Sequence, residues 1–183
     1  MMLAKNAEKH GMKSWLMPRN NEKKMNIQIF SAENAAKELK QHSKKWHVVS
    51  LRDVHYATGH HPLNGLEDCT KDIIVSGMDD ITWSTNPSLG YTPPTKEKVE
   101  EIVNWVEERQ PKNLMVHCWA GVSRSSATAF ILSCKFNSPE DAFNLLDPKK
   151  HMPNLMIMDY GLDLLNDTEA VKWYRKFIQL QSP

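Results

Sequence analysis

The sequence predicts an α/β domain with a central, mostly parallel sheet of four to five strands and helices on both faces. Short apolar runs alternate with longer stretches of helical periodicity, and strands that alternate with helices usually form a parallel sheet. The run NLMVHC at 113–118 is short and almost continuously apolar. Such a run is typical of a strand that is covered on both faces.

The strands are predicted from short stretches rich in β-branched, aromatic or other apolar residues. These stretches lie at 26–30, 46–53, 72–77 and 113–118. Residues 53–69 and 78–95 lack periodicity and are predicted as loops. The second loop contains three prolines, and a loop of this length in a compact domain often carries function.

The helices are predicted from apolar spacing and from capping residues at their starts. The segment after Thr95 shows the i, i+3, i+4, i+7 spacing of an amphipathic helix, and Thr95 can cap it. Ser31 and Ser138 can cap two further helices, the second with Pro139 at its first position. Helices are expected at 32–42, 96–110 and 124–136, from 139 onward, and near 154–165 and 168–180.

Composition and charge are those of an ordinary globular domain. The chain has 183 residues, 40% hydrophobic and 25% charged, with a net charge of +1. We therefore expect neither nucleic acid nor a membrane as a partner. Three cysteines without a CxxC pair argue against a disulfide framework or a zinc cluster and favour a reducing compartment. The oligomeric state is left open.

The chain divides into a short polar arm and one domain. Residues 1–24 lack periodicity and are predicted as a loosely ordered arm, or as a segment that packs on the domain through Trp15. Residues 25–183 are predicted as a single domain. We find neither a signal-peptide pattern nor an apolar run long enough to span a membrane, so a cytoplasmic location is the default expectation.

The stretch HCWAGVSRS, residues 117–125, places a thiol and an arginine where a strand meets a helix. Its small residues allow several backbone N–H groups to turn inward above the helix N-terminus, which makes an anion site suited to phosphate. Such a site and a nearby cation stabilise a thiolate, so Cys118 is expected to act as a nucleophile toward phosphorus. Arg124 can bind two phosphate oxygens, and Ser125 can donate a hydrogen bond to the sulfur. His117 is expected to order the loop.

This stretch resembles the signature loop of the cysteine-dependent protein tyrosine phosphatases, and its Ala-Gly-x-Ser-Arg-Ser ending is similar to the dual-specificity branch. The resemblance implies that branch's compact catalytic fold and hydrolysis of a phosphorylated protein or small phosphomonoester through a cysteinyl-phosphate. It implies no cofactor and no metal. Phosphate would be bound by Trp119, Ala120, Gly121, Val122, Ser123 and Arg124. Below, residues 118–124 are called the signature loop.

The family carries a general acid, an aspartate, on a loop upstream of the cysteine. Asp79 and Asp80 stand at the start of the 78–95 loop. The order Met78-Asp79-Asp80 matches relatives in which the second acidic residue is catalytic, so Asp80 is preferred and Asp79 is assigned a supporting role. The 78–95 loop lacks the Trp-Pro-Asp triplet of the larger enzymes. VVSLRD and HMPNLMIMDYGLDLL resemble a bacterial group of predicted tyrosine phosphatases.

Several other residues near the expected site keep more than one interpretation. The 53–69 loop carries three histidines and a cysteine: His55, His60, His61 and Cys69. They could bind a metal, although their spacing matches no standard ligand pattern, or the loop could form the rim of the pocket. Arg52 could position substrate or pair with a carboxylate such as Asp53. As in some members of the family that the chain resembles, Cys69 or Cys134 could form a disulfide with an oxidised Cys118. Cys69 is the better candidate because it lies on a loop, whereas Cys134 is expected to be core.

Three functions compete on these residues. The first is the phosphatase; the second is a phosphate-binding module that has lost catalysis; the third is another thiol enzyme, an arsenate reductase or a sulfurtransferase. Relatives that act on inositol phosphates or phospholipids often have basic residues in this loop. The signature loop carries no lysine, so the resemblance favours phosphorylated side chains as substrates. Trp83 and Tyr91 could stack on an aromatic substrate. A nucleotide, a sugar phosphate or an RNA end remains a possible substrate.

Overall fold

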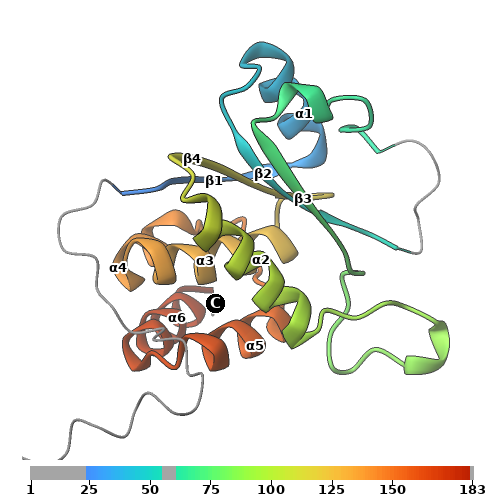
Figure 1. The fold of residues 1–183 in the computed structure, drawn as a ribbon. Coiled ribbons are helices and arrows are strands. Elements are labelled where there is room, and N and C mark those ends of the chain that lie inside the picture. Colours follow the sequence, from blue (N-terminus) through green and yellow to red (C-terminus); the bar gives the residue numbers. More distant parts are fainter. Residues whose placement is uncertain (1–23, 55–60, 182–183) are drawn as a thin grey trace, which may run out of the picture.

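The computed structural model describes residues 24–54 and 61–181, and every structural statement below refers to these residues. Strands and helices alternate as far as β4, and four helices then complete the chain (Figure 1). The elements are β1 (Asn26–Ser31), α1 (Ala32–Gln41), β2 (His47–Arg52), η1 (Glu67–Cys69), β3 (Asp72–Gly77), η2 (Pro87–Leu89), α2 (Lys96–Arg109), β4 (Asn113–Cys118), α3 (Arg124–Phe136), α4 (Pro139–Leu145), α5 (Leu155–Leu165) and α6 (Thr168–Gln181).

The sheet has four strands in the order β1-β4-β2-β3, and all three neighbouring pairs are parallel. The predicted α/β class is confirmed, and each predicted strand is present. Ser31 lies opposite Cys118, and Arg52 lies opposite Gly77, so the carboxyl ends of the strands share one edge. In open parallel sheets ligands bind outside this edge.

Helices cover both faces of the sheet, as Figure 1 shows: α1 on one side and α2 to α6 on the other. Side chains along a strand alternate between these faces. In β4, Leu114 and Val116 join the large core under α2 to α6, whereas Met115 joins the smaller core under α1 with Trp46 and Val48. The central strand is therefore buried on both faces, which accounts for its continuous apolar run.

Capping side chains start the helices where the sequence predicts them. The Ser31 hydroxyl accepts from the Asn34 N–H at 3.2 Å, and the Ser138 hydroxyl accepts from the Asp141 N–H at 3.1 Å. The helix predicted near 154–165 is present as α5, which begins at Leu155 with Asn154 as its N-cap. Apart from Lys24, the predicted arm at 1–24 lies outside the described residues.

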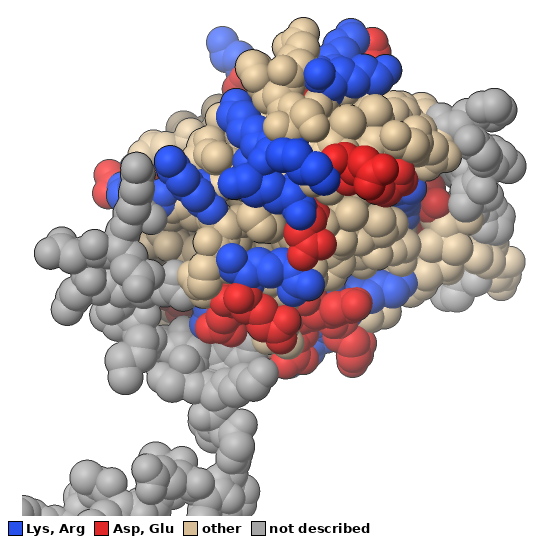
Figure 2. All heavy atoms as spheres, turned by 45° about the horizontal axis from the view of Figure 1, so that its top comes forward, with Lys and Arg blue, Asp and Glu red and all other residues tan. Residues whose placement is uncertain are grey.

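The surface carries charges of both signs. Figure 2 shows basic side chains gathered across the middle of one face, with acidic side chains directly beside them. Ion pairs between side chains of opposite charge include Lys45–Glu38 and Arg109–Asp72. Among the described residues, no helix is both long enough and apolar enough to span a membrane.

Candidate active site

The signature loop leaves β4 at the carboxyl edge of the sheet and enters α3, as the sequence predicts. Backbone hydrogen bonds hold it from two sides: the Ala32 N–H donates to the Trp119 carbonyl at 3.0 Å, and the Met152 N–H donates to the Val122 carbonyl at 3.1 Å. Such bonds leave the loop little freedom. The loop is therefore tied to the start of α1 on one side and to the segment before α5 on the other.

Gly121 allows the loop to pass close to the β1–α1 junction. Its φ is +73°, a conformation that favours glycine. A Cβ at this position would lie 2.7 Å from the Ser31 nitrogen and 2.8 Å from the Phe30 carbonyl carbon. Both neighbours are backbone atoms, so any other residue would force the loop or β1 to move.

Cys118 ends β4 with its side chain buried beneath the loop; the residue is 1% exposed. Its sulfur lies 3.2 Å from the hydroxyl oxygen of Ser125, which is itself fully buried in the first turn of α3. A hydroxyl at this distance can donate to a thiolate. The structure thus brings together two residues that the sequence assigned to one site.

Arg124 lies buried at the start of α3 and is held by two partners. Its Nη1 donates to the Met78 carbonyl at 2.6 Å and lies 3.0 Å from Asp53 Oδ1, while Nη2 donates to Asp53 Oδ2 at 3.1 Å. Its Nε is buried and has no hydrogen-bond partner among the described residues. One N–H donor of the guanidinium therefore makes no hydrogen bond and can donate to a ligand, although Asp80 Oδ2 lies 3.8 Å from it.

The sequence analysis considered Asp53 only as a partner of Arg52 and so missed its pairing with Arg124. In the structure Arg52 turns elsewhere: its Nε donates to the Ser50 hydroxyl at 3.0 Å and its Nη1 to Asn64 Oδ1 at 3.2 Å. The position of Asp53 in the sequence could have indicated this role. It directly follows the last residue of a parallel strand, and residues at such ends often face the ligand.

The two candidate acids occupy different environments. Asp80 reaches the signature loop: the Ser123 hydroxyl donates to its Oδ1 at 2.7 Å, and its Oδ2 lies 3.8 Å from Arg124 Nε. Asp79 is buried, 3% exposed, and accepts from the backbone N–H groups of Val54 at 2.9 Å and Thr92 at 2.7 Å. Asp80 therefore faces the site, whereas Asp79 anchors the 78–95 loop.

His117 is fully buried, and its Nδ1 lies 3.5 Å from the Cys118 carbonyl. Burial, with the His61 ring 5.5 Å away, lowers the pKa of His117 to about 3. Burial and the charge of Arg52 lower the pKa of His61 to about 4. Both rings are therefore neutral near pH 7. With its lowered pKa, His117 is suited to ordering the loop and poorly suited to acid–base chemistry.

Two exposed tryptophans lie on the loops of the candidate site, Trp119 on the signature loop and Trp83 on the 78–95 loop. Trp119 is 60% exposed and contacts His61 at a ring distance of 6.3 Å. Trp83 is 57% exposed, and its Nε1 donates to Asp159 Oδ2 at 2.9 Å, which ties the 78–95 loop to α5. At 60% exposure the Trp119 indole does not pack beneath the signature loop.

The three cysteines are free. Cys134 is buried in α3, and burial raises the pKa of its thiol, so its predicted core position is confirmed. Cys69 ends η1, where its carbonyl accepts from the Lys44 N–H at 2.7 Å. No group of three or more potential metal ligands is found in 24–54 and 61–181; His55 and His60 lie outside the described residues.

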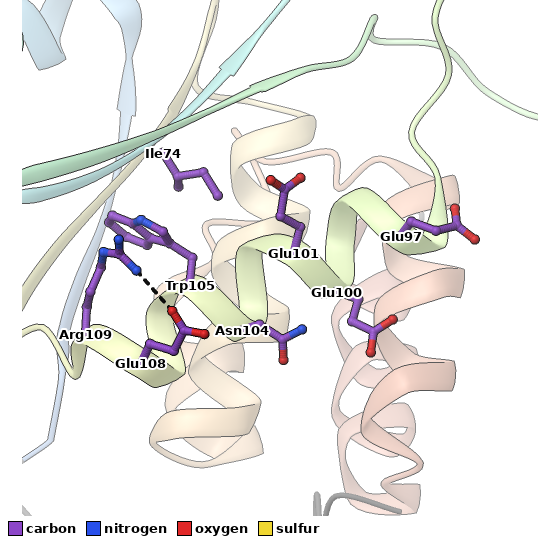
Figure 3. Close-up of a pocket in the computed structure, with 8 residues that line it drawn as sticks. All are labelled: Ile74, Glu97, Glu100, Glu101, Asn104, Trp105, Glu108 and Arg109. Atoms are coloured by element: carbon purple, nitrogen blue, oxygen red, sulfur yellow. Dashed lines mark hydrogen bonds and ion pairs between the residues drawn. The ribbon is translucent and has the colours of Figure 1, made fainter. Parts of the chain in front are cut away.

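A separate hollow of about 460 Å³ runs along α2 beside β3 (Figure 3). Four glutamates line it together with Ile74, Asn104, Trp105 and Arg109: Glu97, Glu100, Glu101 and Glu108. Repulsion by these carboxylates disfavours a phosphate there. Cys118, Arg124 and Asp80 are absent from its lining, so the candidate active site remains the signature loop.

Two solved structures resemble this fold over most of its length. The human tyrosine phosphatase-like serine/threonine/tyrosine-interacting protein matches with a TM-score of 0.50 and 16% identity, over 76% of this chain and 90% of its own. PTPMT1 in complex with PI(5)P matches with a TM-score of 0.53 and 12% identity, over 82% of this chain and 94% of its own. No sequence family model and no curated protein matches the chain. The chain therefore has the fold of the protein tyrosine phosphatases, which confirms the predicted resemblance at the level of the fold.

Proposed function

We propose that this chain is a phosphomonoester hydrolase that acts through a cysteinyl-phosphate intermediate. The observation that carries the proposal is the convergence of three groups on one loop. Cys118 lies under the loop beside Ser125, Arg124 starts the helix behind it, and Asp80 bonds to the loop through Ser123. A nucleophile, an anion-binding cation and a proton donor are the three groups that phosphoryl transfer to a thiolate needs.

In the first step the Cys118 thiolate attacks phosphorus, and the bond to the leaving oxygen breaks. Arg124 binds the phosphoryl oxygens through its free Nε while Asp53 holds the other end of the guanidinium. Signature-loop N–H groups take up part of the charge. The leaving oxygen receives a proton from Asp80, which becomes a carboxylate.

In the second step water hydrolyses the cysteinyl-phosphate. The Asp80 carboxylate takes a proton from the attacking water, the phosphorus–sulfur bond breaks, and inorganic phosphate and the thiolate are released. Ser125, with its hydroxyl 3.2 Å from the sulfur, stabilises the thiolate as it forms. The cycle returns Asp80 to its protonated form.

For the substrate we propose phosphorylated protein side chains, on tyrosine alone or with dual specificity. The support is the absence of lysine from the signature loop and the exposed indoles of Trp119 on that loop and Trp83 on the 78–95 loop. PTPMT1 was crystallised with PI(5)P, so a phosphoinositide belongs in the substrate panel beside phosphotyrosine and phosphoserine peptides, a nucleotide and a phosphorylated RNA end.

The test is hydrolysis of para-nitrophenyl phosphate by the wild type and by Cys118→Ser in the presence of EDTA. We expect turnover by the wild type, none by the variant, and phosphate bound to cysteine after acid quenching. Turnover that survives Cys118→Ser would overturn the mechanism. No turnover together with vanadate binding would instead favour a phosphate-binding module.

A further inference from the structure

Asn154 connects three parts of the candidate site. It is the N-cap of α5 and is buried, 3% exposed. Its backbone N–H donates to the Ser123 carbonyl at 3.2 Å. Its side-chain oxygen accepts from the N–H groups of Met156 at 3.1 Å and Ile157 at 3.2 Å, which caps the helix. The sequence analysis assigned this residue no role.

The side-chain nitrogen of Asn154 makes two further hydrogen bonds, both to the 78–95 loop. It donates to Asp80 Oδ1 at 2.9 Å and to the Ile81 carbonyl at 2.9 Å. Because the oxygen faces two N–H donors and the nitrogen faces two acceptors, the amide fits in one orientation only. Capping α5 requires only the side-chain oxygen, so the two hydrogen bonds of the nitrogen must serve a different purpose, which is to hold the 78–95 loop.

The same contacts make the two oxygens of Asp80 unequal. Oδ1 accepts from Asn154 and also from the Ser123 hydroxyl at 2.7 Å. Oδ2 lies 3.8 Å from Arg124 Nε and accepts no hydrogen bond among the described residues. The amide nitrogen of Asn154 can only donate, so a proton on the side of Oδ1 that faces Asn154 would point at another hydrogen.

We propose that Asn154 is a positioning residue that places the transferable proton of Asp80 on Oδ2. This inference rests on the proposed role of Asp80 as general acid. Because Oδ1 accepts from the amide nitrogen of Asn154, which has no acceptor to offer, the transferable proton resides on Oδ2, the oxygen nearer Arg124. When the bond between phosphorus and the leaving oxygen breaks, that proton moves to the leaving oxygen. The carboxylate that remains keeps its bonds to Asn154 and Ser123.

The discriminating variant is Asn154→Asp, which retains an oxygen to cap α5 and replaces the donor with a carboxylate beside Asp80. We expect kcat/KM for phenyl phosphate, a poor leaving group, to fall about tenfold or more, within the range of general acid catalysis. Para-nitrophenyl phosphate, whose leaving group needs little protonation, should lose much less. The basic limb of the pH profile should move to higher pH, because a second carboxylate disfavours ionised Asp80.

Two further proteins separate positioning from helix capping. Asn154→Ser keeps a capping oxygen, adds no charge and cannot reach Asp80, so it should show the same substrate dependence without the large pH shift. Ser138→Ala removes the cap of α4 away from the site. It should lower thermal stability and leave both substrates and the pH profile unchanged.

The outcomes also separate this inference from the proposed function. If the wild type hydrolyses both substrates and both Asn154 variants slow them equally without a pH shift, Asn154 is only structural. If the wild type hydrolyses neither, the proposed function fails. The Asp80 carboxyl can then be titrated by carbon NMR in Cys118→Ser protein. Its midpoint must move to higher pH with Asn154→Asp added, and an unchanged midpoint would overturn the inference.

Discussion

Asp53, directly after β2, pairs with both terminal nitrogens of Arg124 at the start of α3. The two nitrogen–oxygen distances are 3.0 and 3.1 Å, and the side chains are 24% and 3% exposed. A planar carboxylate that meets a planar guanidinium in this way fixes the direction of the fork. The third nitrogen of Arg124, Nε, then points to a defined place, where a phosphate oxygen can meet it.

Replacing Asp53 with alanine should disorient Arg124. We expect vanadate binding to weaken about 10- to 100-fold, because a small displacement of a binding group can reduce its effect by this much. The free energy of unfolding should fall by about 1–3 kcal/mol, because a buried cation loses its partner. The matched control is Asp72→Ala, which breaks the more exposed pair with Arg109 and should cost about 1 kcal/mol or less. Wild-type vanadate affinity in Asp53→Ala would contradict the assignment.

Asp80→Asn should mainly reduce turnover, whereas Asp79→Asn should mainly reduce stability. Asp80→Asn removes the proton donor and should lower turnover of phenyl phosphate about 10²- to 10⁴-fold, with little loss of stability. Asp79→Asn should affect turnover mildly. It should lower the unfolding free energy by about 1–3 kcal/mol, since its amide turns one donor toward a backbone N–H. Steady-state kinetics and urea unfolding separate the two, and the reverse pattern would assign the acid to Asp79.

His117 and His61 should make the fold sensitive to acid. Their pKa values, about 3 and about 4, lie below the 6.5 of an ordinary histidine. The unfolded chain therefore takes up protons first as the pH falls. The stability from these groups is complete above about pH 6.5 and is lost toward pH 4.

For the buried His117 this loss amounts to about 2 kcal/mol between pH 7 and pH 5. His61 is partly exposed and contributes less. Urea unfolding at the two pH values measures the slope. Burial also lowers the pKa of His47 and His151, so the comparison with His61→Gln isolates one group. A slope that does not become shallower in that variant would contradict the prediction.

Gly121→Ala should displace the signature loop, because its Cβ would lie 2.7 Å from the Ser31 nitrogen. We expect loss of vanadate binding and a stability cost of about 2–5 kcal/mol, the sum of backbone strain and overpacking. Gly65→Ala is the matched control: its φ is +79°, yet a Cβ there meets nothing within 4 Å. It should lose only about 1–2 kcal/mol and should bind vanadate normally. Equal effects of the two variants would show that contact with β1 is unimportant.

Features with a local cause could be predicted from the sequence. The strands follow from apolar runs, the caps at Ser31 and Ser138 from their side chains, and the signature loop from residue types at fixed spacing. The choice between Asp79 and Asp80 needed more, because neighbouring residues of a loop can face opposite ways. Pattern and resemblance favoured Asp80, and the structure turns its side chain toward Ser123.

Contacts between residues that are far apart in the sequence could not be predicted from local sequence patterns. Asp53 is 71 positions from Arg124, and Asn154 is 74 positions from Asp80. Each pair meets because the sheet order brings loops from separate strands and from α5 to one edge. Asn154 did carry one local signal, since asparagine is a preferred N-cap. That signal predicts a helix start and says nothing of the two bonds that its nitrogen makes to the 78–95 loop.

Ser125→Ala should slow the second chemical step more than the first. The Ser125 hydroxyl is 3.2 Å from the Cys118 sulfur, and a hydrogen bond to a charged group is worth about 1.5–3 kcal/mol, or at least tenfold in rate. Without it the thiolate is a poorer leaving group, so cysteinyl-phosphate accumulates. Stopped-flow mixing with para-nitrophenyl phosphate should show a burst near one equivalent of nitrophenol per enzyme, followed by slow turnover.

Ser126→Ala is the matched control, because its hydroxyl bonds only to the Val122 and Ser123 carbonyls. It should show no burst. Acid quenching during the slow phase should recover phosphate on Cys118 in the Ser125→Ala protein and far less in the control. If Ser125→Ala turns over at the wild-type rate with no burst, the hydroxyl does not assist thiolate departure. The proximity of Ser125 and Cys118 would then be packing at the strand–helix junction.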